Sequence, residues 1–81
     1  MPFHYVYLLE SRETGAHRYV GLTNDLKSRL EKHNRGEVPH TSKFRPWVMT
    51  VAVAFRQREK AAAFEVYLKS HSGRAFARRH F

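Results

Sequence analysis

Hydrophobic residues gather in three short stretches whose length and composition are typical of β-strands. Tyr5–Leu9 and His17–Leu22 are rich in aromatic and branched residues, and the polar cluster Glu10–Gly15 separates them. The third stretch, Trp47–Phe55, places a bulky residue at every second position. We therefore expect a β-hairpin and, further along the chain, a third strand.

The length of the hairpin loop suggests a register for the first two strands. If the loop is Ser11–Gly15, then Ala16 pairs with Glu10, and Tyr7 lies directly opposite Tyr19. Directly paired residues point to the same face of a sheet. We therefore expect the two tyrosine side chains on one face.

The segment Asp25–Asn34 has the features of a helix. Thr23 and Asn24 are suited to cap its first turn, and Leu26 and Leu30 recur four positions apart. The aspartate at its start suits the positive end of the helix dipole, and a glycine two residues beyond its end closes the segment.

Two more helices are expected after the third strand. Arg58–Ser70 is rich in alanine near its start and repeats hydrophobic residues at helical spacing, and Gly73 is expected to end it. Arg74–Phe81 forms a short last helix. The predicted order is strand, strand, helix, strand, helix, helix, which is an α+β fold with a three-stranded antiparallel sheet flanked by helices.

The charge of the chain narrows the class of its partners. Fifteen Lys and Arg oppose seven Asp and Glu, so the formal net charge is +8 with six neutral His. Such an excess attracts polyanions, and contacts of Lys and Arg with phosphates supply most non-specific affinity for nucleic acid. A charged surface kept for solubility is the alternative. Nucleic acid is the expected partner.

Length and composition limit the class of protein. The 81 residues give room for a single domain, residues 1–81, and 42% hydrophobic residues are sufficient for a core. The absence of cysteine excludes disulfides and thiolate metal sites. The first apolar run is too short to span a bilayer, so we expect a soluble cytoplasmic protein without a membrane partner.

Three groups of residues could carry chemistry. They are a tyrosine pair, Tyr7 and Tyr19; a polar pair on the first helix, Arg29 and His33; and one carboxylate, Glu65. Each group also has an ordinary explanation. Aromatic residues are common in sheets, the helical pair could belong to a solvated face, and Glu65 could form a surface ion pair with Lys69, four positions on.

Several motifs, in order along nearly the whole chain, resemble those of the GIY-YIG nuclease superfamily. They are Tyr5-Val6-Tyr7, Tyr19-Val20-Gly21, and Asn24-Asp25-Leu26 followed by Arg29 and His33. Three later segments are similar to the loop and third strand, the metal-binding helix and the C-terminal segment of its small stand-alone members: Thr41–Trp47, Glu65–Lys69 and Ser72–Phe76. Tyr5 replaces a glycine of the pattern, Val6 and Val20 replace isoleucines, and a C-terminal asparagine of some members has no counterpart.

The resemblance implies an activity as well as the fold already expected. It implies a divalent-metal-dependent DNA endonuclease or nickase that hydrolyses phosphodiester bonds, with Mg²⁺ or Mn²⁺ as cofactor. A non-catalytic nucleic-acid-binding module that keeps the fold is the alternative function, and RNA is the alternative substrate. Since the chain has no appended specificity domain, a partner protein could supply specificity.

The resemblance also implies a role for each candidate residue. Glu65 would be the metal ligand, because Mg²⁺ commonly takes one or two carboxylates and completes its shell with water and phosphate oxygens. Tyr19 would activate or orient the nucleophile, with Tyr7 hydrogen-bonding beside it. Arg29 would hold the scissile phosphate and neutralise developing charge. His33 would assist as acid, base or orienting group.

Two basic segments and one glycine are expected to contact nucleic acid. Gly21, at the end of the second strand, would let a phosphate approach closely. The loop before the third strand and the C-terminal segment, which lacks acidic residues, would supply the residues His40, Thr41, Lys43, Arg45, Lys69, Arg74 and Arg78. A solvated basic loop is the alternative for the first segment.

Overall fold

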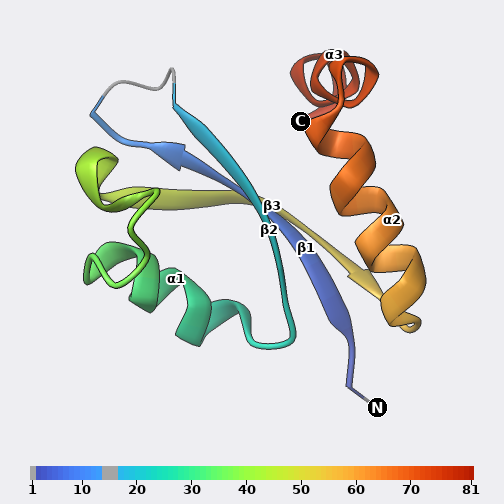
Figure 1. Ribbon diagram of the computed structural model, residues 1–81, viewed down its shortest axis with the longest axis horizontal. Helices are drawn as coiled ribbons and strands as arrows, with labels where there is room; N and C mark the ends of the chain where they lie inside the picture. Colours follow the sequence, from blue (N-terminus) through green and yellow to red (C-terminus); the bar gives the residue numbers. More distant parts are fainter. Residues whose placement is uncertain (1, 14–16) are drawn as a thin grey trace.

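The computed structural model describes residues 2–13 and 17–81, which form a twisted sheet with helices on both faces (Figure 1). The elements are β1 (His4–Ser11), β2 (Arg18–Thr23), α1 (Leu26–Asn34), a 3₁₀ turn η1 (Ser42–Phe44), β3 (Trp47–Phe55), α2 (Arg58–Lys69) and α3 (His71–His80). The strand order is β2-β1-β3, and both pairs are antiparallel. The predicted α+β fold is confirmed.

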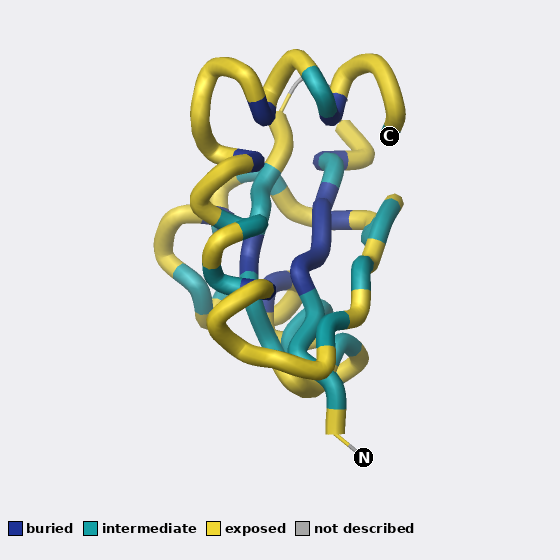
Figure 2. The backbone as a smooth tube through the Cα atoms, turned by 90° about the vertical axis from the view of Figure 1, so that its right-hand side faces the viewer, coloured by how far each residue is buried: buried dark blue, intermediate teal, exposed yellow. Residues whose placement is uncertain are grey.

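Strand β1 lies in the middle of the sheet and carries the core, as the dark blue segment in Figure 2 shows. Because side chains alternate along a strand, its two faces serve two separate clusters. Val6 packs with Ala61 and Leu68 of α2. Tyr7 and Leu9 face the other way and pack with residues of α1 and β3. The sheet is therefore covered by α2 and α3 on one face and by α1 on the other.

A β-bulge divides the hydrophobic stripe of β3 between these two faces. Leu8 of β1 pairs with Val51, whereas the next residue, Leu9, pairs with Met49, so Thr50 is an extra residue. The hydroxyl of Thr50 donates to the Leu8 carbonyl at 3.3 Å. Because paired residues share a face, the two halves of β3 point their bulky side chains in opposite directions. The predicted strand is confirmed, but the bulky side chains before and after the bulge lie on opposite faces of the sheet.

The predicted register of the hairpin is wrong by two residues. Tyr7 pairs with Gly21, and Tyr19 pairs with Leu9. The cause lies in β3, which continues to pair with β1 as far as Ser11 and so keeps that residue in the strand. Because the error is an even number of residues, Tyr7 and Tyr19 still share a face, with ring centroids 6.2 Å apart.

The predicted hairpin loop starts one residue too early. Ser11 belongs to β1, and its N–H donates to the His17 carbonyl at 3.0 Å. Glu10, for which Ala16 was the expected partner, pairs with Arg18. Residues 14–16 of the expected loop and pairing lie outside the described residues.

Helix α1 begins one residue later than predicted. Its N-cap is Asp25 and not Thr23 or Asn24, which the sequence suggested. The Asp25 carboxylate accepts a hydrogen bond from the Ser28 N–H at 3.1 Å. The hydroxyl of Thr23 accepts instead from the Asp25 N–H at 3.1 Å and so fixes the turn that leads into the helix.

The prediction that Gly73 ends the second helix is wrong. Helix α2 ends at Lys69, and Ser70 caps α3 by accepting a hydrogen bond from the Gly73 N–H at 3.1 Å. Gly73 lies buried in the first turn of α3, where a Cβ would collide with the Tyr67 carbonyl of α2. The missing side chain therefore allows α3 to pack closely across the end of α2.

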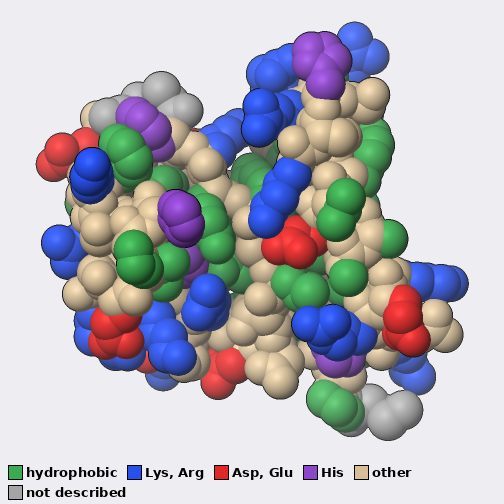
Figure 3. All heavy atoms as spheres, in the orientation of Figure 1, with side chains coloured by type: hydrophobic (Ala, Val, Ile, Leu, Met, Phe, Trp, Pro, Cys, Tyr) green, Lys and Arg blue, Asp and Glu red, His purple; other side chains and the backbone are tan. Residues whose placement is uncertain are grey.

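Lys and Arg side chains are spread over the surface, and several gather beside the column formed by α2 and α3 (Figure 3).

Within residues 2–13 and 17–81, no helix has the length and hydropathy that crossing a lipid bilayer requires.

We expect Gly73→Ala to lower the free energy of unfolding. Overpacking costs about 1–3 kcal/mol, and here the added methyl meets backbone, which cannot move aside as a side chain can. This cost should exceed the gain of about 1 kcal/mol in helix propensity. Urea unfolding measures the difference, with Ser72→Ala on the exposed side of the same turn as control. A Gly73→Ala protein at least as stable as wild type would contradict this account of the α2–α3 contact.

Candidate nuclease site

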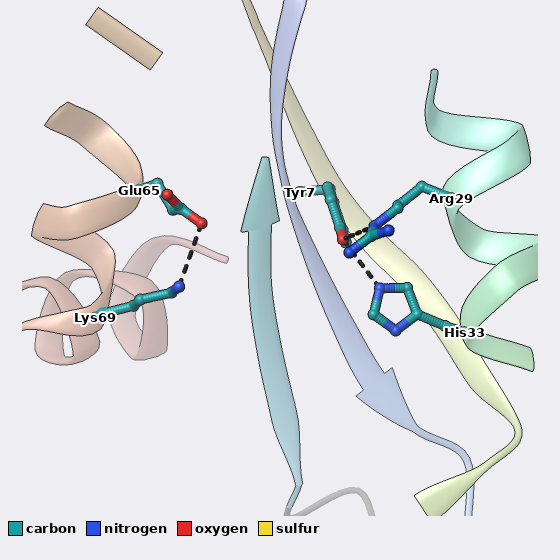
Figure 4. A network of polar contacts seen from close by, with 5 residues as sticks. All are labelled: Tyr7, Arg29, His33, Glu65 and Lys69. Atoms are coloured by element: carbon teal, nitrogen blue, oxygen red, sulfur yellow. Dashed lines mark hydrogen bonds and ion pairs between the residues drawn. The ribbon is translucent and has the colours of Figure 1, made fainter. Parts of the chain in front are cut away.

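The candidate residues lie on both sides of the edge strand β2 (Figure 4). Tyr7 of β1 meets Arg29 and His33 of α1 on one side, and Glu65 projects from α2 on the other.

Tyr7 is the centre of a buried polar network beneath α1. Its side chain is 1% exposed, and its hydroxyl lies 3.0 Å from His33 Nε2 and accepts a hydrogen bond from Arg29 Nε at 3.3 Å. A Cβ at Gly21 would collide with the phenol, so this glycine provides the space that the ring occupies. Burial raises the pKa of Tyr7, and the hydrogen bond from Arg29 opposes that rise only in part. The phenol is therefore protonated at neutral pH.

His33 is fully buried and is hydrogen-bonded at both ring nitrogens. Its Nδ1 lies 2.8 Å from the Thr41 hydroxyl, and its Nε2 contacts Tyr7. Burial, and then the positive charge of Arg29, lower the pKa of His33. The imidazole is therefore held in its neutral form, with one nitrogen that donates and one that accepts.

The two ends of this network fix the direction of every hydrogen bond. The Thr41 hydroxyl donates to the Val38 carbonyl at 3.3 Å, so it accepts from Nδ1–H of His33. The Nε2 of neutral His33 then accepts the proton of Tyr7. At the other end, the guanidinium of Arg29 can only donate. We therefore assign the Nδ1–H tautomer to His33.

Thr41 lies beneath the loop surface and not on it. Its side chain is 1% exposed, and both hydrogen bonds of its hydroxyl go to protein groups. Its carbonyl accepts a hydrogen bond from Trp47 Nε1 at 2.9 Å, which ties the loop to β3. Sequence reasoning placed Thr41 among residues that contact nucleic acid, whereas its observed contacts hold the His33 ring.

The structure brings together four of the five residues expected in catalysis. The Tyr19 ring lies 4.9 Å from the His33 ring, centroid to centroid, on the same side of the sheet as Tyr7. The hydrogen bond to Tyr7 is the main reason why the pKa of Arg29 is raised, and neighbouring Tyr19 adds to it. Arg29 is thus a permanent cation held between two phenols.

Glu65 stands apart from this cluster but within its electrostatic reach. Its carboxylate, 22% exposed, pairs with the Lys69 ammonium at 3.2 Å, so the surface ion pair that the sequence allowed is present. The negative charge of Glu65 is also one of the weaker influences that raise the pKa of Tyr7. The charge of Glu65 therefore acts weakly on Tyr7 across β2.

The described residues contain no group of three or more His, Cys, Asp or Glu side chains that could hold a metal ion. Glu65 offers one carboxylate, a hard oxygen ligand, and one of its oxygens pairs with the Lys69 ammonium. Mg²⁺ commonly binds through one or two carboxylates and fills its shell with water and phosphate oxygens. The donor set therefore fits a metal that binds together with a phosphate-bearing substrate.

Of the residues expected to contact nucleic acid, Gly21 and Thr41 are buried against the Tyr7 network, and the others fall into two places. His40, Lys43 and Arg45 are exposed on the loop between α1 and β3. The other set lines a groove of about 630 Å³ beside β2, whose polar lining residues are Arg18, Tyr19, Lys69, Arg74 and Arg78. Sequence reasoning missed Arg18. In the predicted register it would pair with apolar Leu8, whereas it pairs with Glu10 and forms an ion pair of 3.1 Å.

We expect Thr41→Val to destabilise the protein, because it leaves the buried Nδ1–H of His33 without an acceptor. The cost of an unsatisfied buried donor is about 1–3 kcal/mol. Thr41→Ser keeps the hydroxyl and is the matched control. Urea unfolding measures stability, and ¹⁵N NMR of the imidazole reports the tautomer. If the valine and serine variants are equally stable and share one tautomer, the assigned direction of the network is wrong.

We expect a pH dependence of stability from His33. Its folded pKa lies below the ordinary value of 6.5, so the unfolded state takes up a proton first as the pH falls. The contribution of neutral His33 is complete above pH 6.5 and is lost as the pH falls from 6.5 through the folded pKa. NMR titration of the His33 ring in the wild-type protein should give a midpoint below 6.5. A midpoint at or above that value contradicts the argument.

A known protein family matches nearly the whole chain. Residues 3–79 match the family model of the GIY-YIG catalytic domain. No curated protein matches the chain. Since the family match spans nearly all of the 81 residues, the chain belongs to the GIY-YIG catalytic domain family.

Proposed function

We propose that the protein is a divalent-metal-dependent DNA endonuclease or nickase, which hydrolyses phosphodiester bonds beside β2. The family supports the general activity, since GIY-YIG domains are generally endonucleases that act on DNA. The observation that carries the proposal is the buried network of Tyr7, Arg29 and His33, which holds a cation next to a partly exposed tyrosine and across from a carboxylate.

Arg29 is proposed to bind the scissile phosphate. Its Nε donates to Tyr7, which restricts the plane of the guanidinium. The forked donors of a held guanidinium match two phosphate oxygens and can follow the charge that grows on them during the reaction. A pre-positioned cation needs little reorganisation at that moment.

Tyr7 and His33 are proposed to position Arg29 and not to exchange protons with the substrate. The Tyr7 proton points to His33 Nε2, and both side chains are almost completely buried. The raised pKa of Tyr7 also keeps it in the phenol form at neutral pH, and a phenol cannot take up the proton of an attacking water. Tyr19, which is less buried and lines the groove, is the residue proposed to orient or deprotonate the attacking water.

Glu65 is proposed to hold the divalent cation. When bound, such a cation would supply Lewis-acid stabilisation of the negative charge that develops on the phosphate. The contribution of Glu65 itself is a carboxylate fixed on a helix, at the opposite side of β2 from Arg29. A phosphate at the outer edge of β2 would then be close to the positive charge of Arg29 on one side and to that of the cation held by Glu65 on the other.

We expect purified protein to nick supercoiled plasmid in Mg²⁺ or Mn²⁺, and Arg29→Ala and Glu65→Gln to slow nicking by about 10²–10³, the usual effect of removing a group that stabilises the transition state. Glu59→Gln, an exposed carboxylate on the same helix, is the control and should cut at the wild-type rate. Gel analysis of product against time gives the rates, and competition with RNA of the same sequence decides between DNA and RNA.

The opposite results would favour a non-catalytic binding module. They are an absence of cleavage by wild-type protein on duplex, branched and single-stranded DNA, or undiminished cleavage by the two site variants. Binding of DNA without metal-dependent nicking would identify that module directly.

A further inference from the structure

The groove beside β2 carries strong positive charge on its walls. Its floor includes the apolar side chains of Leu8, Val20 and Ala77. Its charged lining residues come from three elements and are all cationic: Arg18 of β2, Lys69 of α2, and Arg74 and Arg78 of α3. Figure 3 shows such Lys and Arg side chains gathered beside α2 and α3. No carboxylate lies among its lining residues.

Two of these cations have no counter-ion. Arg74 and Arg78 lie four positions apart on one face of α3, and in the part of the chain that the structure describes neither forms an ion pair. Like charges at this spacing destabilise a helix. The other two have only exposed partners: Arg18 pairs with Glu10 and Lys69 pairs with Glu65. Exposed ion pairs stabilise little and are readily exchanged for another anion.

The basic loop between α1 and β3 differs from the groove, because two of its arginines are bonded to groups of the loop itself. The Nε of Arg45 donates to the Ser42 carbonyl at 2.8 Å, and its guanidinium lies against Gly36, so the side chain folds back on its own loop. Arg35, at the start of the loop, pairs with Glu37 at 2.7 Å. Arg35 and Arg45 are therefore less available to bind an external anion than Arg74 and Arg78.

Tyr19 connects the groove to the proposed reaction site. Tyr19 is one of the residues that line the groove on the edge strand β2, and its ring, on the Tyr7 face of the sheet, lies 4.9 Å from the His33 ring, centroid to centroid. An extended polyanion that contacts Tyr19 at one phosphate can therefore reach the groove with the phosphates that follow. Lys and Arg on an apolar floor suit such a ligand, because the phosphodiester backbone is charged and the sugars are less polar.

We propose that this groove binds the phosphodiester backbone of the nucleic acid that flanks the reacting bond, and that Arg18, Arg74 and Arg78 are its phosphate-binding residues. In this proposal the nucleic-acid strand leaves the site across β2 towards α3, and not along the loop that carries Lys43 and Arg45. The proposal rests on the proposed function only in taking nucleic acid as the partner.

Binding without metal tests this path. The probes are a fluorescein-labelled 20-nucleotide DNA strand and its 20-base-pair duplex, in EDTA, measured by anisotropy over a range of KCl concentrations. For whichever probe wild type binds more tightly, Arg74→Gln/Arg78→Gln should weaken binding roughly 25- to 60-fold at 0.1 M salt, because each lost phosphate contact lowers the slope of log K against log salt by about 0.7–0.9. Arg18→Gln should lower that slope by about one contact.

Two charge-matched double variants complete the experiment. Arg56→Gln/Lys60→Gln removes two positive charges at the start of α2 and should leave the salt slope unchanged. Lys43→Gln/Arg45→Gln tests the alternative path along the loop. The proposal is overturned if wild type binds neither probe, if the groove variant binds as wild type does, or if the loop variant loses as much affinity as the groove variant. Thermal unfolding verifies that each variant is folded.

Nicking assays on the same variants separate the two proposals. If wild type does not nick DNA but the groove variant loses binding, the groove proposal stands and the nuclease proposal fails. If wild type nicks and the groove variant binds and nicks as wild type does, the groove proposal alone is overturned.

Discussion

The phenolic hydroxyl of Tyr7 is buried in the middle of the sheet, and a buried hydroxyl is costly unless it is hydrogen-bonded. Most of the α1 side of the protein is arranged to meet that requirement. Gly21 leaves space for the ring, and His33 and Arg29 supply the acceptor and the donor. His33 in turn needs an acceptor for its second nitrogen, which brings the loop residue Thr41 into the interior.

Trp47 also fixes the loop and α1 to the sheet. Trp47, at the start of β3, donates its indole N–H to the Thr41 carbonyl, and its own backbone N–H and carbonyl both bond to the side chain of Asn34 at the end of α1. A strand, a loop and a helix that are separate in sequence are thereby joined. The position of Arg29 on this helix is fixed as a result, although Arg29 itself is only half-buried.

Local sequence patterns were sufficient to predict the element order and the strand Trp47–Phe55, because the hydrophobic period acts over a few residues. The family resemblance, and not a local pattern, pointed to Tyr7, Arg29 and His33 as site residues. The errors arose where a distant element decides. Pairing with β3 extends β1 to Ser11 and so shifts the hairpin, and contact with α2 requires Gly73, a residue that local rules assign to a helix end. Burial of Thr41 depends on Trp47 and His33, and no local pattern reveals it.

The bulge at Thr50 has a wider consequence. Because β3 changes face there, and because β1 alternates, each strand contributes to two cores that share no buried side chain. Apart from Tyr19, which lines the groove and packs in the Tyr7 cluster, residues around the groove can therefore be replaced without repacking that cluster, and the reverse also holds. Such a division lets partner affinity and chemical competence be altered one at a time, which favours both divergence in nature and stepwise redesign in the laboratory.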